Sequence, residues 1–250
     1  MITLLEIIKG IIMKFNPDYI LENYEKEMLG EYVVFFPSKK SNKLLVLFSA
    51  MNDKNKYDRL SWFWDEKEEW ISYSILYISD TNYTYYLGTP EKPMFHTYEK
   101  IIKYFQTKIL ANNENTITVG SSMGGYGAIL FAYKMGLNGA ITGVPNINKK
   151  SALMHNYTNW YKSMQKTGDL WIDLDILLRR NYRLPNLYIE YGNYSADNYS
   201  IKDIKEIYDN SISLLCLQKG SVNDHKYFMS KITINSFANL FFNNNFIDNQ

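Results

Sequence analysis

Residues 116–128 constrain the fold of this chain more than any other stretch, and they read T-I-T-V-G-S-S-M-G-G-Y-G-A. Ile117 and Val119 are apolar and β-branched, which favours a short buried strand. The mostly apolar residues 126–135 that follow favour a helix. A sharp turn from strand to helix is therefore predicted at residues 120–124.

The turn reads G-S-S-M-G, which fits the pattern G-x-S-x-G with Ser122 at its apex. Such a turn holds the apical serine in a strained conformation, and the backbone packs closely on both sides. Residues two before and two after must then lack a side chain, as Gly120 and Gly124 do. The following helix directs its first amide, that of Met123, at an oxygen that Ser122 attacks. We therefore expect a nucleophilic Ser122 and an oxyanion donor at Met123, although a glycine-rich turn without chemistry gives the same pattern.

Composition excludes several classes of function. The chain has 250 residues with 27 basic and 26 acidic side chains, so no basic surplus points to nucleic acid. The single cysteine, Cys216, excludes an internal disulfide framework and a cysteine-rich metal site. It lies in an apolar run, so we expect a buried structural thiol there. No metal ion is expected.

The first 15 residues are apolar but are interrupted by Glu6 and Lys9. They lack a basic start and a small-residue cleavage site, so no signal peptide is predicted. No apolar run is long enough to span a bilayer. We expect an amphipathic helix that packs on the domain or touches a membrane surface, and a cytoplasmic protein.

Predicted strands and helices alternate along the chain, without a repeat or linker. Strands are expected at residues 31–39, 43–50, 71–78, 138–144, 186–192 and 211–217 and just before the serine turn, with helices at 97–111, 201–208 and 226–242 and after that turn. This pattern predicts a single domain over residues 1–250 with a doubly wound, mostly parallel sheet and helices on both faces. The serine turn makes the expected fold α/β-hydrolase-like. Residues 57–70 are expected to form a short helix or rim loop, and residues 81–93 a surface excursion.

Residues 145–183 form the least regular part of the sequence, and two helices with a break near Gly168 are predicted there. Such an insertion commonly forms a lid or a wall of the acceptor site. Ordinary helices that cover the sheet are an equal alternative. Trp160 and Trp171 lie in this segment and are candidate substrate-binding residues.

A serine hydroxyl needs a base, and the chain has three histidines. His96 and His155 lie on helical or insertion segments. His225 lies in the loop after the last predicted strand, where a doubly wound sheet gathers its site. The chain order serine, acid, histidine is also the order of an α/β-hydrolase. His225 is therefore the predicted base.

The acid that orients the imidazole should follow the penultimate strand. Asp197 is the only carboxylate in the predicted loop 193–199. Glu190 falls inside the strand and Asp203 inside the next helix, while Asp224 adjoins His225 in sequence, which usually turns the two side chains apart. Asp197 is therefore the predicted acid.

A second oxyanion amide is expected after the strand at residues 43–50. An α/β-hydrolase places the donor loop at this point, and S-A-M-N over residues 49–52 is small enough for the backbone to approach a substrate. Ala50 and Met51 are the two candidates.

Four motifs carry a resemblance to a known family: G-S-S-M-G-G-Y-G-A at residues 120–128, F-S-A at 48–50, G-x(4)-D-N-Y at 192–199 and G-S-V-N-D-H at 220–225. Together they resemble the α/β-hydrolase-fold O-acetyltransferases of bacterial capsular polysaccharide. A similar core occurs in an α/β-hydrolase protein of the accessory Sec export system. The resemblance covers about residues 43–225.

The resemblance implies transfer of an acetyl group from acetyl-CoA, a co-substrate that is not tightly bound, to a hydroxyl of a capsular or surface polysaccharide. An acetyl-Ser122 intermediate would form on the way. The implied partners are the acyl donor, the glycan and a membrane-bound capsule assembly complex. The protein would associate with that complex peripherally. Two alternatives stay open: a carboxylesterase or deacetylase with the same triad, and a non-catalytic scaffold in a capsule or export complex.

Overall fold

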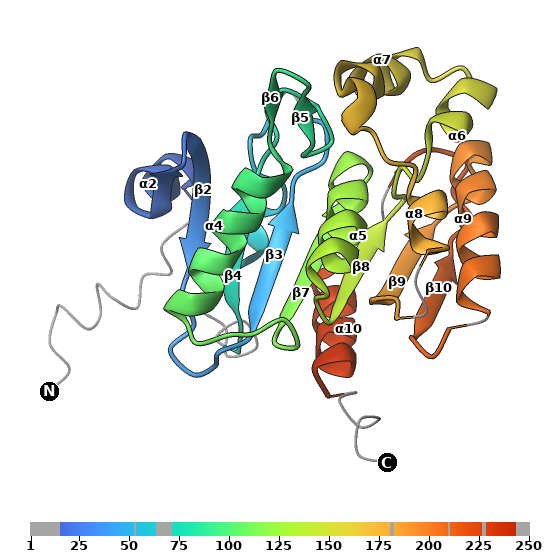
Figure 1. Ribbon diagram of the computed structural model, residues 1–250. Helices are drawn as coiled ribbons and strands as arrows, with labels where there is room; N and C mark the ends of the chain where they lie inside the picture. The colour runs from blue at the N-terminus through green and yellow to red at the C-terminus, as the bar shows by residue number, and fades with distance from the viewer. Residues whose placement is uncertain are drawn as a thin grey trace, which may run out of the picture.

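A computed structural model gives the structure of the protein and describes residues 16–52, 54–63, 72–180, 183–209, 211–226 and 229–243. The helix predicted within residues 1–15 lies outside this part of the chain. The described residues form an eight-stranded sheet of order β1-β2-β4-β3-β7-β8-β9-β10, with helices on both faces (Figure 1). The predicted fold class is therefore confirmed.

The strands of the sheet are β1 (Glu25–Met28), β2 (Glu31–Phe36), β3 (Leu44–Phe48), β4 (Ser74–Ile78), β7 (Thr116–Ser121), β8 (Gly139–Gly143), β9 (Asn186–Tyr191) and β10 (Leu215–Lys219). β2 runs antiparallel to both β1 and β4, whereas β3, β4, β7, β8, β9 and β10 pair in parallel. The strands β3, β4, β7 and β8 are buried along their whole length, because helices cover both of their faces.

Helices α4 (Phe95–Lys108), α5 (Met123–Met135), α8 (Leu174–Leu178) and α9 (Ser195–Tyr208) cover one face. Helices α2 (Pro17–Tyr24) and α10 (Lys231–Asn243) pack on the other (Figure 1). Each face has its own apolar cluster. Phe105, Phe131 and Ile204 belong to the first cluster, and Ile20 and Phe241 belong to the second.

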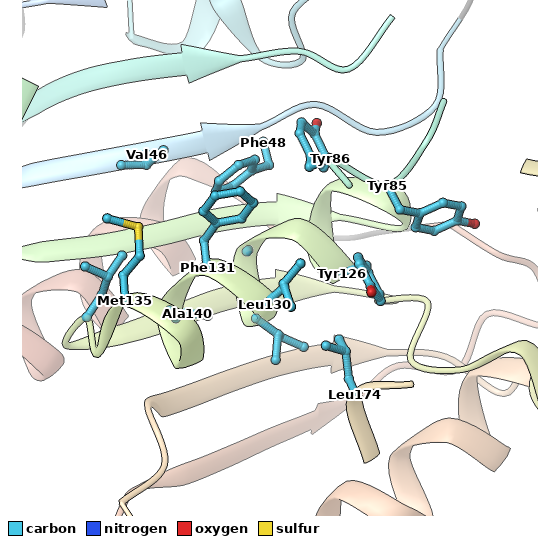
Figure 2. Packing of buried hydrophobic residues seen from close by; sticks show 14 of the residues in the cluster. Val46, Phe48, Tyr85, Tyr86, Tyr126, Leu130, Phe131, Met135, Ala140 and Leu174 are labelled. Atoms are coloured by element: carbon cyan, nitrogen blue, oxygen red, sulfur yellow. The ribbon is translucent and has the colours of Figure 1, made fainter. Parts of the chain in front are cut away.

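Helix α5 lies in the middle of the first face and is apolar around most of its surface, apart from the exposed Lys134 in its last turn. Its Phe131 stacks on Phe48 of β3 with the ring centroids 5.0 Å apart (Figure 2). Leu130 and Ala132 are fully buried beside it. The helix is therefore fixed against the sheet, and so is the turn at its N-terminus.

The segment between β8 and β9 holds α6 (Lys149–Met154), α7 (Thr158–Lys166), the short 3-10 helix η2 (Gly168–Leu170) and α8. Gly168 has a φ of 53° and marks the predicted break. Helices α6 and α7 lie beyond the carboxyl ends of the central strands, whereas α8 packs on the sheet (Figure 1). Part of the segment thus covers the sheet, and a lid role for the rest stays a prediction.

Two predictions of local structure were wrong in part. Residues 81–93 are a surface excursion only in part, because residues 84–88 are buried, Tyr85 and Tyr86 fully, whereas residues 81–82 and 90–93 are exposed. The short hairpin of β5 (Gly88–Thr89) and β6 (Lys92–Pro93) lies at the end of this segment. Helix α9 begins at Ser195, six residues before the predicted start, so Asp197 lies in its first turn rather than in a loop. An aspartate in the first turn interacts favourably with the helix dipole, which supports this early start.

Smaller differences concern the edges of the sheet. Strand β10 begins at Leu215 rather than at residue 211, and Cys216 on this edge strand is only half-buried. The last helix begins at Lys231. Within residues 57–70, the described part forms η1 (Leu60–Phe63). Among the helices of the described residues, none combines the length and the apolar character needed to cross a bilayer.

Candidate active site

Ser122 lies at the point where β7 turns into α5. Its backbone has φ 52° and ψ −118°, a conformation that is strained for a residue with a side chain. A Cβ on Gly120 would lie 2.1 Å from the carbonyl oxygen of Gly124, and a Cβ on Gly124 would lie 2.2 Å from that of Phe48. Both glycines are therefore sterically required, as the motif predicted.

His225 and Asp197 meet at Ser122. Nε2 of His225 lies 2.9 Å from Oγ of Ser122, and Nδ1 lies 2.9 Å from Oδ1 of Asp197. A carboxylate only accepts hydrogen bonds, so Nδ1 carries the proton and Nε2 is left to accept the serine hydroxyl. The three predicted residues thus form one hydrogen-bonded chain in the order that a serine nucleophile requires.

Asp197 approaches His225 from the first turn of α9 and is 3% exposed. Its Oδ2 is buried and has no hydrogen-bond partner among the described residues. The imidazole of His225 is also largely covered, with 14% of the side chain exposed. Burial strengthens the attraction between this carboxylate and an imidazolium, because little water screens it.

The other two histidines have different partners. Nδ1 of His96 lies 2.8 Å from Glu99 on the surface of α4. Nδ1 of His155, at the C-terminal end of α6, lies 3.0 Å from Oγ of Ser195. The structure brings His225, and neither of these, to Ser122.

The two candidate amides for the oxyanion after β3 differ in their bonding. The amide of Ala50 donates to Oδ2 of Asp58 at 2.6 Å, so it is already used. Met51 follows it on the same loop, and its role as the donor from this side stays a prediction. On the other side, Met123 is the first residue of α5, where an amide has no acceptor within the helix.

Solved structures with the same fold include an acetyltransferase and a hydrolase. The chain is similar to the capsule O-acetyltransferase of Neisseria meningitidis serogroup A, with 21% identity, a TM-score of 0.63 and coverage of 87% of this chain and 92% of that one. It is also similar to an S-formylglutathione hydrolase from Agrobacterium tumefaciens, with 15% identity, a TM-score of 0.59 and coverage of 88% and 98%. The fold is that of the α/β-hydrolases.

A third similar structure is the glycosylation-associated Gap123 complex from Streptococcus agalactiae, with 12% identity and a TM-score of 0.61. The match covers 89% of this chain and 47% of that one. No protein-family model and no curated protein matches the sequence. At these identities the similarity establishes the fold. The similar structures include a capsule O-acetyltransferase, the class of protein that the sequence motifs resemble.

The α/β-hydrolase fold here separates the two predicted tryptophans. Trp160 on α7 packs against the base, with its ring centroid 4.2 Å from that of His225, and Tyr157 lies 4.4 Å from Trp160. Trp171 instead stacks on Tyr126 of α5 at 4.7 Å. Trp160 therefore borders the triad, whereas one ring face of Trp171 is already covered.

Two polar contacts near Ser122 were missed from the sequence. Oδ1 of Asn146 lies 3.2 Å from Oγ of Ser122, and Nη2 of Arg59 donates to Oγ of Ser121 at 2.5 Å. Asn146 follows β8, the neighbour of the nucleophile strand, and carboxyl ends of parallel strands meet at one edge. That rule could have indicated Asn146, but no local signal marks Arg59.

A metal site is not evident in the part of the chain that the structure describes, where no three His, Cys, Asp or Glu side chains gather as metal ligands would. The hydrogen-bonded chain from Ser122 through His225 to Asp197 is an arrangement that can activate a serine hydroxyl as a nucleophile.

Proposed function

We propose that the protein is a serine-dependent acyltransferase that acetylates hydroxyl groups of a bacterial capsular or surface polysaccharide with acetyl-CoA as donor. The observation that carries the proposal is the hydrogen-bonded chain from Ser122 through His225 to Asp197. The fold shared with the meningococcal capsule O-acetyltransferase supports the choice of donor and acceptor. A mutant of that enzyme has been crystallised with CoA.

In the first half-reaction, Nε2 of His225 takes the proton of Ser122 while Oγ attacks the thioester carbonyl. The carbonyl oxygen becomes an oxyanion, which the amides of Met123 and Met51 stabilise. When the intermediate collapses, the C–S bond breaks and His225 returns the proton to the sulfur. CoA leaves as the thiol and Ser122 carries the acetyl group. Throughout, Asp197 stabilises the transient imidazolium.

In the second half-reaction, a sugar hydroxyl takes the place of the thiol. Nε2 of His225 removes its proton while its oxygen attacks the acetyl carbonyl. The bond to Oγ then breaks, and the proton moves from His225 to Ser122. The products are an O-acetyl sugar and the free enzyme.

Transfer competes with hydrolysis, because water can attack the same acetyl-serine. Trp160 lies over His225, and Tyr194 lies 5.9 Å from His225 on another side. Aromatic rings can stack on a sugar and displace loosely held water from the base. This aromatic border of the triad supports a glycan acceptor.

Two other functions use the same fold. The S-formylglutathione hydrolase among the similar structures supports an esterase, in which water is the acceptor. The Gap123 complex supports a non-catalytic component of an assembly. The intact bonding of Ser122 favours catalysis over the second. The proposed donor is a cytoplasmic metabolite, so we place the reaction in the cytoplasm, at a capsule assembly complex.

The test uses acetyl-CoA labelled in its acetyl group, with and without capsular oligosaccharides, and mass spectrometry of the products. We expect labelled sugar with the unmodified protein, none with Ser122→Ala, and normal transfer with Ser61→Ala, which removes an exposed hydroxyl elsewhere. If acetate is released at the same rate with and without every glycan, the transferase is excluded and the esterase is supported. If the folded protein consumes no acyl donor, the non-catalytic scaffold is supported.

A further inference from the structure

Ser122 has a second hydrogen-bond partner besides His225. Oδ1 of Asn146 lies 3.2 Å from its Oγ, and the backbone amide of Asn146 donates to the carbonyl oxygen of Ser122 at 3.3 Å. Asn146 is 6% exposed. The hydroxyl of Tyr85 donates to the same Oδ1 at 3.3 Å. A buried carboxamide is thus held between the nucleophile and a buried phenol.

The loop that carries Tyr85 is strained and strongly anchored. Tyr83, Tyr85 and Tyr86 have φ values of 55°, 56° and 64°, which are rare for residues with side chains. Oδ2 of Asp80 holds the loop by accepting from the amides of Thr84 at 2.6 Å and Tyr86 at 2.9 Å. Strain of this kind gathers at functional sites, where the surrounding structure fixes a side chain in place.

Tyr85 points from this loop toward the N-terminal turn of α5. Its ring packs edge-on against Tyr126 at 5.3 Å (Figure 2). It packs in the same way against Trp171 at 5.0 Å. Burial raises the pKa of Tyr85 well above its usual range, so the phenol keeps its proton at every working pH. It is therefore a permanent polar partner for Asn146.

Counting protons shows why a carboxamide suits this position. The hydroxyl of Ser122 has one proton. When His225 is charged, its Nε2–H donates to Oγ, and the hydroxyl donates to Oδ1 of Asn146. When His225 is neutral, the hydroxyl donates to Nε2, and an oxygen of Asn146 facing Oγ would leave two acceptors in contact.

Rotation of the amide by 180° removes that conflict. Nδ2 then donates one proton to Oγ of Ser122 and the other to the phenol oxygen of Tyr85, because amide oxygen and nitrogen exchange places with little change in shape. An alanine or a carboxylate at this position could not donate a hydrogen bond to Oγ when His225 is neutral. Asn146 neither gains nor loses a proton in the process.

We propose that Asn146 is a further catalytic residue that holds Oγ of Ser122 in both proton states, and that Tyr85 positions Asn146. The inference rests on the proposed function, since it assumes that Ser122 is the nucleophile. As negative charge develops on Oγ, the N–H of Asn146 stabilises it. Removing the carboxamide should slow every reaction of Ser122, whatever the acceptor.

The test measures the rate at which a fluorophosphonate reacts with Ser122. Oγ attacks phosphorus, fluoride leaves and His225 takes the proton, so the rate reports the nucleophile without any natural substrate. We expect Asn146→Ala to react about 10- to 100-fold more slowly, the range for losing one hydrogen bond to a charged group. Tyr85→Phe, which removes only the hydroxyl, should slow the reaction about two- to tenfold, the range for one neutral hydrogen bond.

Double substitution separates a positioning role from a structural one. Because Tyr85 acts through Asn146, adding Tyr85→Phe to Asn146→Ala should cause no further loss of rate. The double variant also removes the phenol that Asn146→Ala leaves unpaired, so it remains informative if the single variant folds poorly. Tyr208→Phe is the matched control, because it also deletes a buried hydroxyl. That hydroxyl donates to the carbonyl oxygen of Pro185 at 2.8 Å and is not part of the site. This substitution should lower thermal stability and leave the rate unchanged.

Asn146→Asp tests the donated proton, since aspartate keeps the shape and the acceptors but loses the N–H. We expect it to react at least as slowly as Asn146→Ala. Reaction of Asn146→Ala or Asn146→Asp at the wild-type rate would overturn the catalytic role of Asn146, and additive losses would overturn the positioning role of Tyr85. If the unmodified protein does not react, the nucleophile assignment fails and this inference fails with it.

Discussion

The carboxylate of Asp58 accepts a 2.6 Å hydrogen bond from the backbone amide of Ala50. The amide of Asp58 in turn donates to Oγ of Ser49 at 3.2 Å, and Ser49 offers its carbonyl oxygen to the hydroxyl of Tyr86 at 2.5 Å. The loop after β3 is thus tied down at two successive residues. The next amide, that of Met51, is presented by a loop whose conformation is already fixed.

Asp58→Ala should therefore impair the oxyanion site, although Asp58 itself is not expected to contact the substrate. Losing a hydrogen bond to a charged group lets the loop move, and we expect kcat for a chromogenic acetyl ester to fall about tenfold to a hundredfold with little change in KM. Asp58→Asn keeps an acceptor oxygen and should recover most of the rate. Equal rates for the alanine variant and the unmodified protein would remove Asp58 from the positioning of this loop.

His225→Ala should abolish turnover. Without Nε2 the serine keeps its proton, and the loss in kcat should be about 10⁴- to 10⁶-fold, as for other serine triads. His96→Ala is the matched control, because His96 lies on the surface of α4 and bonds Glu99. Steady-state kinetics of the two variants decide the base: comparable losses in both would contradict the assignment of His225.

Asp197→Asn should preserve the fold but lower kcat about 10³- to 10⁴-fold. An asparagine amide that donates to Nδ1 holds the imidazole in the wrong tautomer, so Nε2 would carry the proton and could not accept that of Ser122. Asp203→Asn, on the same helix, serves as control and should keep the wild-type rate. The assignment is lost if the two variants have the same kcat while their circular dichroism is unchanged.

Glu190 gives a prediction about stability and pH. Its side chain is buried, and burial raises the pKa of its carboxyl, although the hydrogen bond from Tyr188 works in the opposite direction. The Tyr188 hydroxyl has one proton but lies 2.8 Å from Glu190 and 2.9 Å from Gln218, so a protonated Glu190 satisfies all three groups.

The folded protein then binds a proton more tightly at Glu190 than the unfolded chain does. This contribution to stability is fully present below the unfolded pKa, near 4.3, and is lost as pH rises through the raised folded pKa. Glu190→Gln should therefore increase the free energy of unfolding at pH 7, by about 1.4 kcal/mol for each unit of pKa difference. Urea unfolding at pH 7 and pH 4 tests this, and a gain that is as large at pH 4 would contradict it.

Much of the site could be predicted because its signals are local or follow chain order. The turn at Ser122 is dictated by contacts within a few residues, since Gly120 and Gly124 leave no room for a Cβ. The strand order places the segments that follow β9 and β10 beside it, and this is enough to indicate Asp197 and His225. The structure brings the three together, and their catalytic roles remain predictions for the experiments above.

The parts that could not be predicted depend on distant contacts. Residues 81–93 are polar and aromatic, typical of an exposed loop, but the buried carboxylate of Asp80 gathers their amides and turns Tyr85 and Tyr86 inward. In the same way, nothing near Asp58 in sequence shows that it bonds Ala50, because the two meet only after the loop between them folds back. No local pattern in the sequence shows that Tyr85, Tyr86 and Tyr126 form the core beside the site.

The contact between Gly124 and Phe48 has a consequence for motion. With no space for a methyl group between the first turn of α5 and the end of β3, neither can shift without the other. Ser122 and the loop that carries Met51 should therefore move as one rigid unit. Trp160 and the helices α6 and α7 border His225 from outside the sheet (Figure 1). We expect these helices, rather than the sheet, to adjust to acceptors of different size. Replacing residues 149–166 with the same segment of a protein of this fold should therefore change the acceptor.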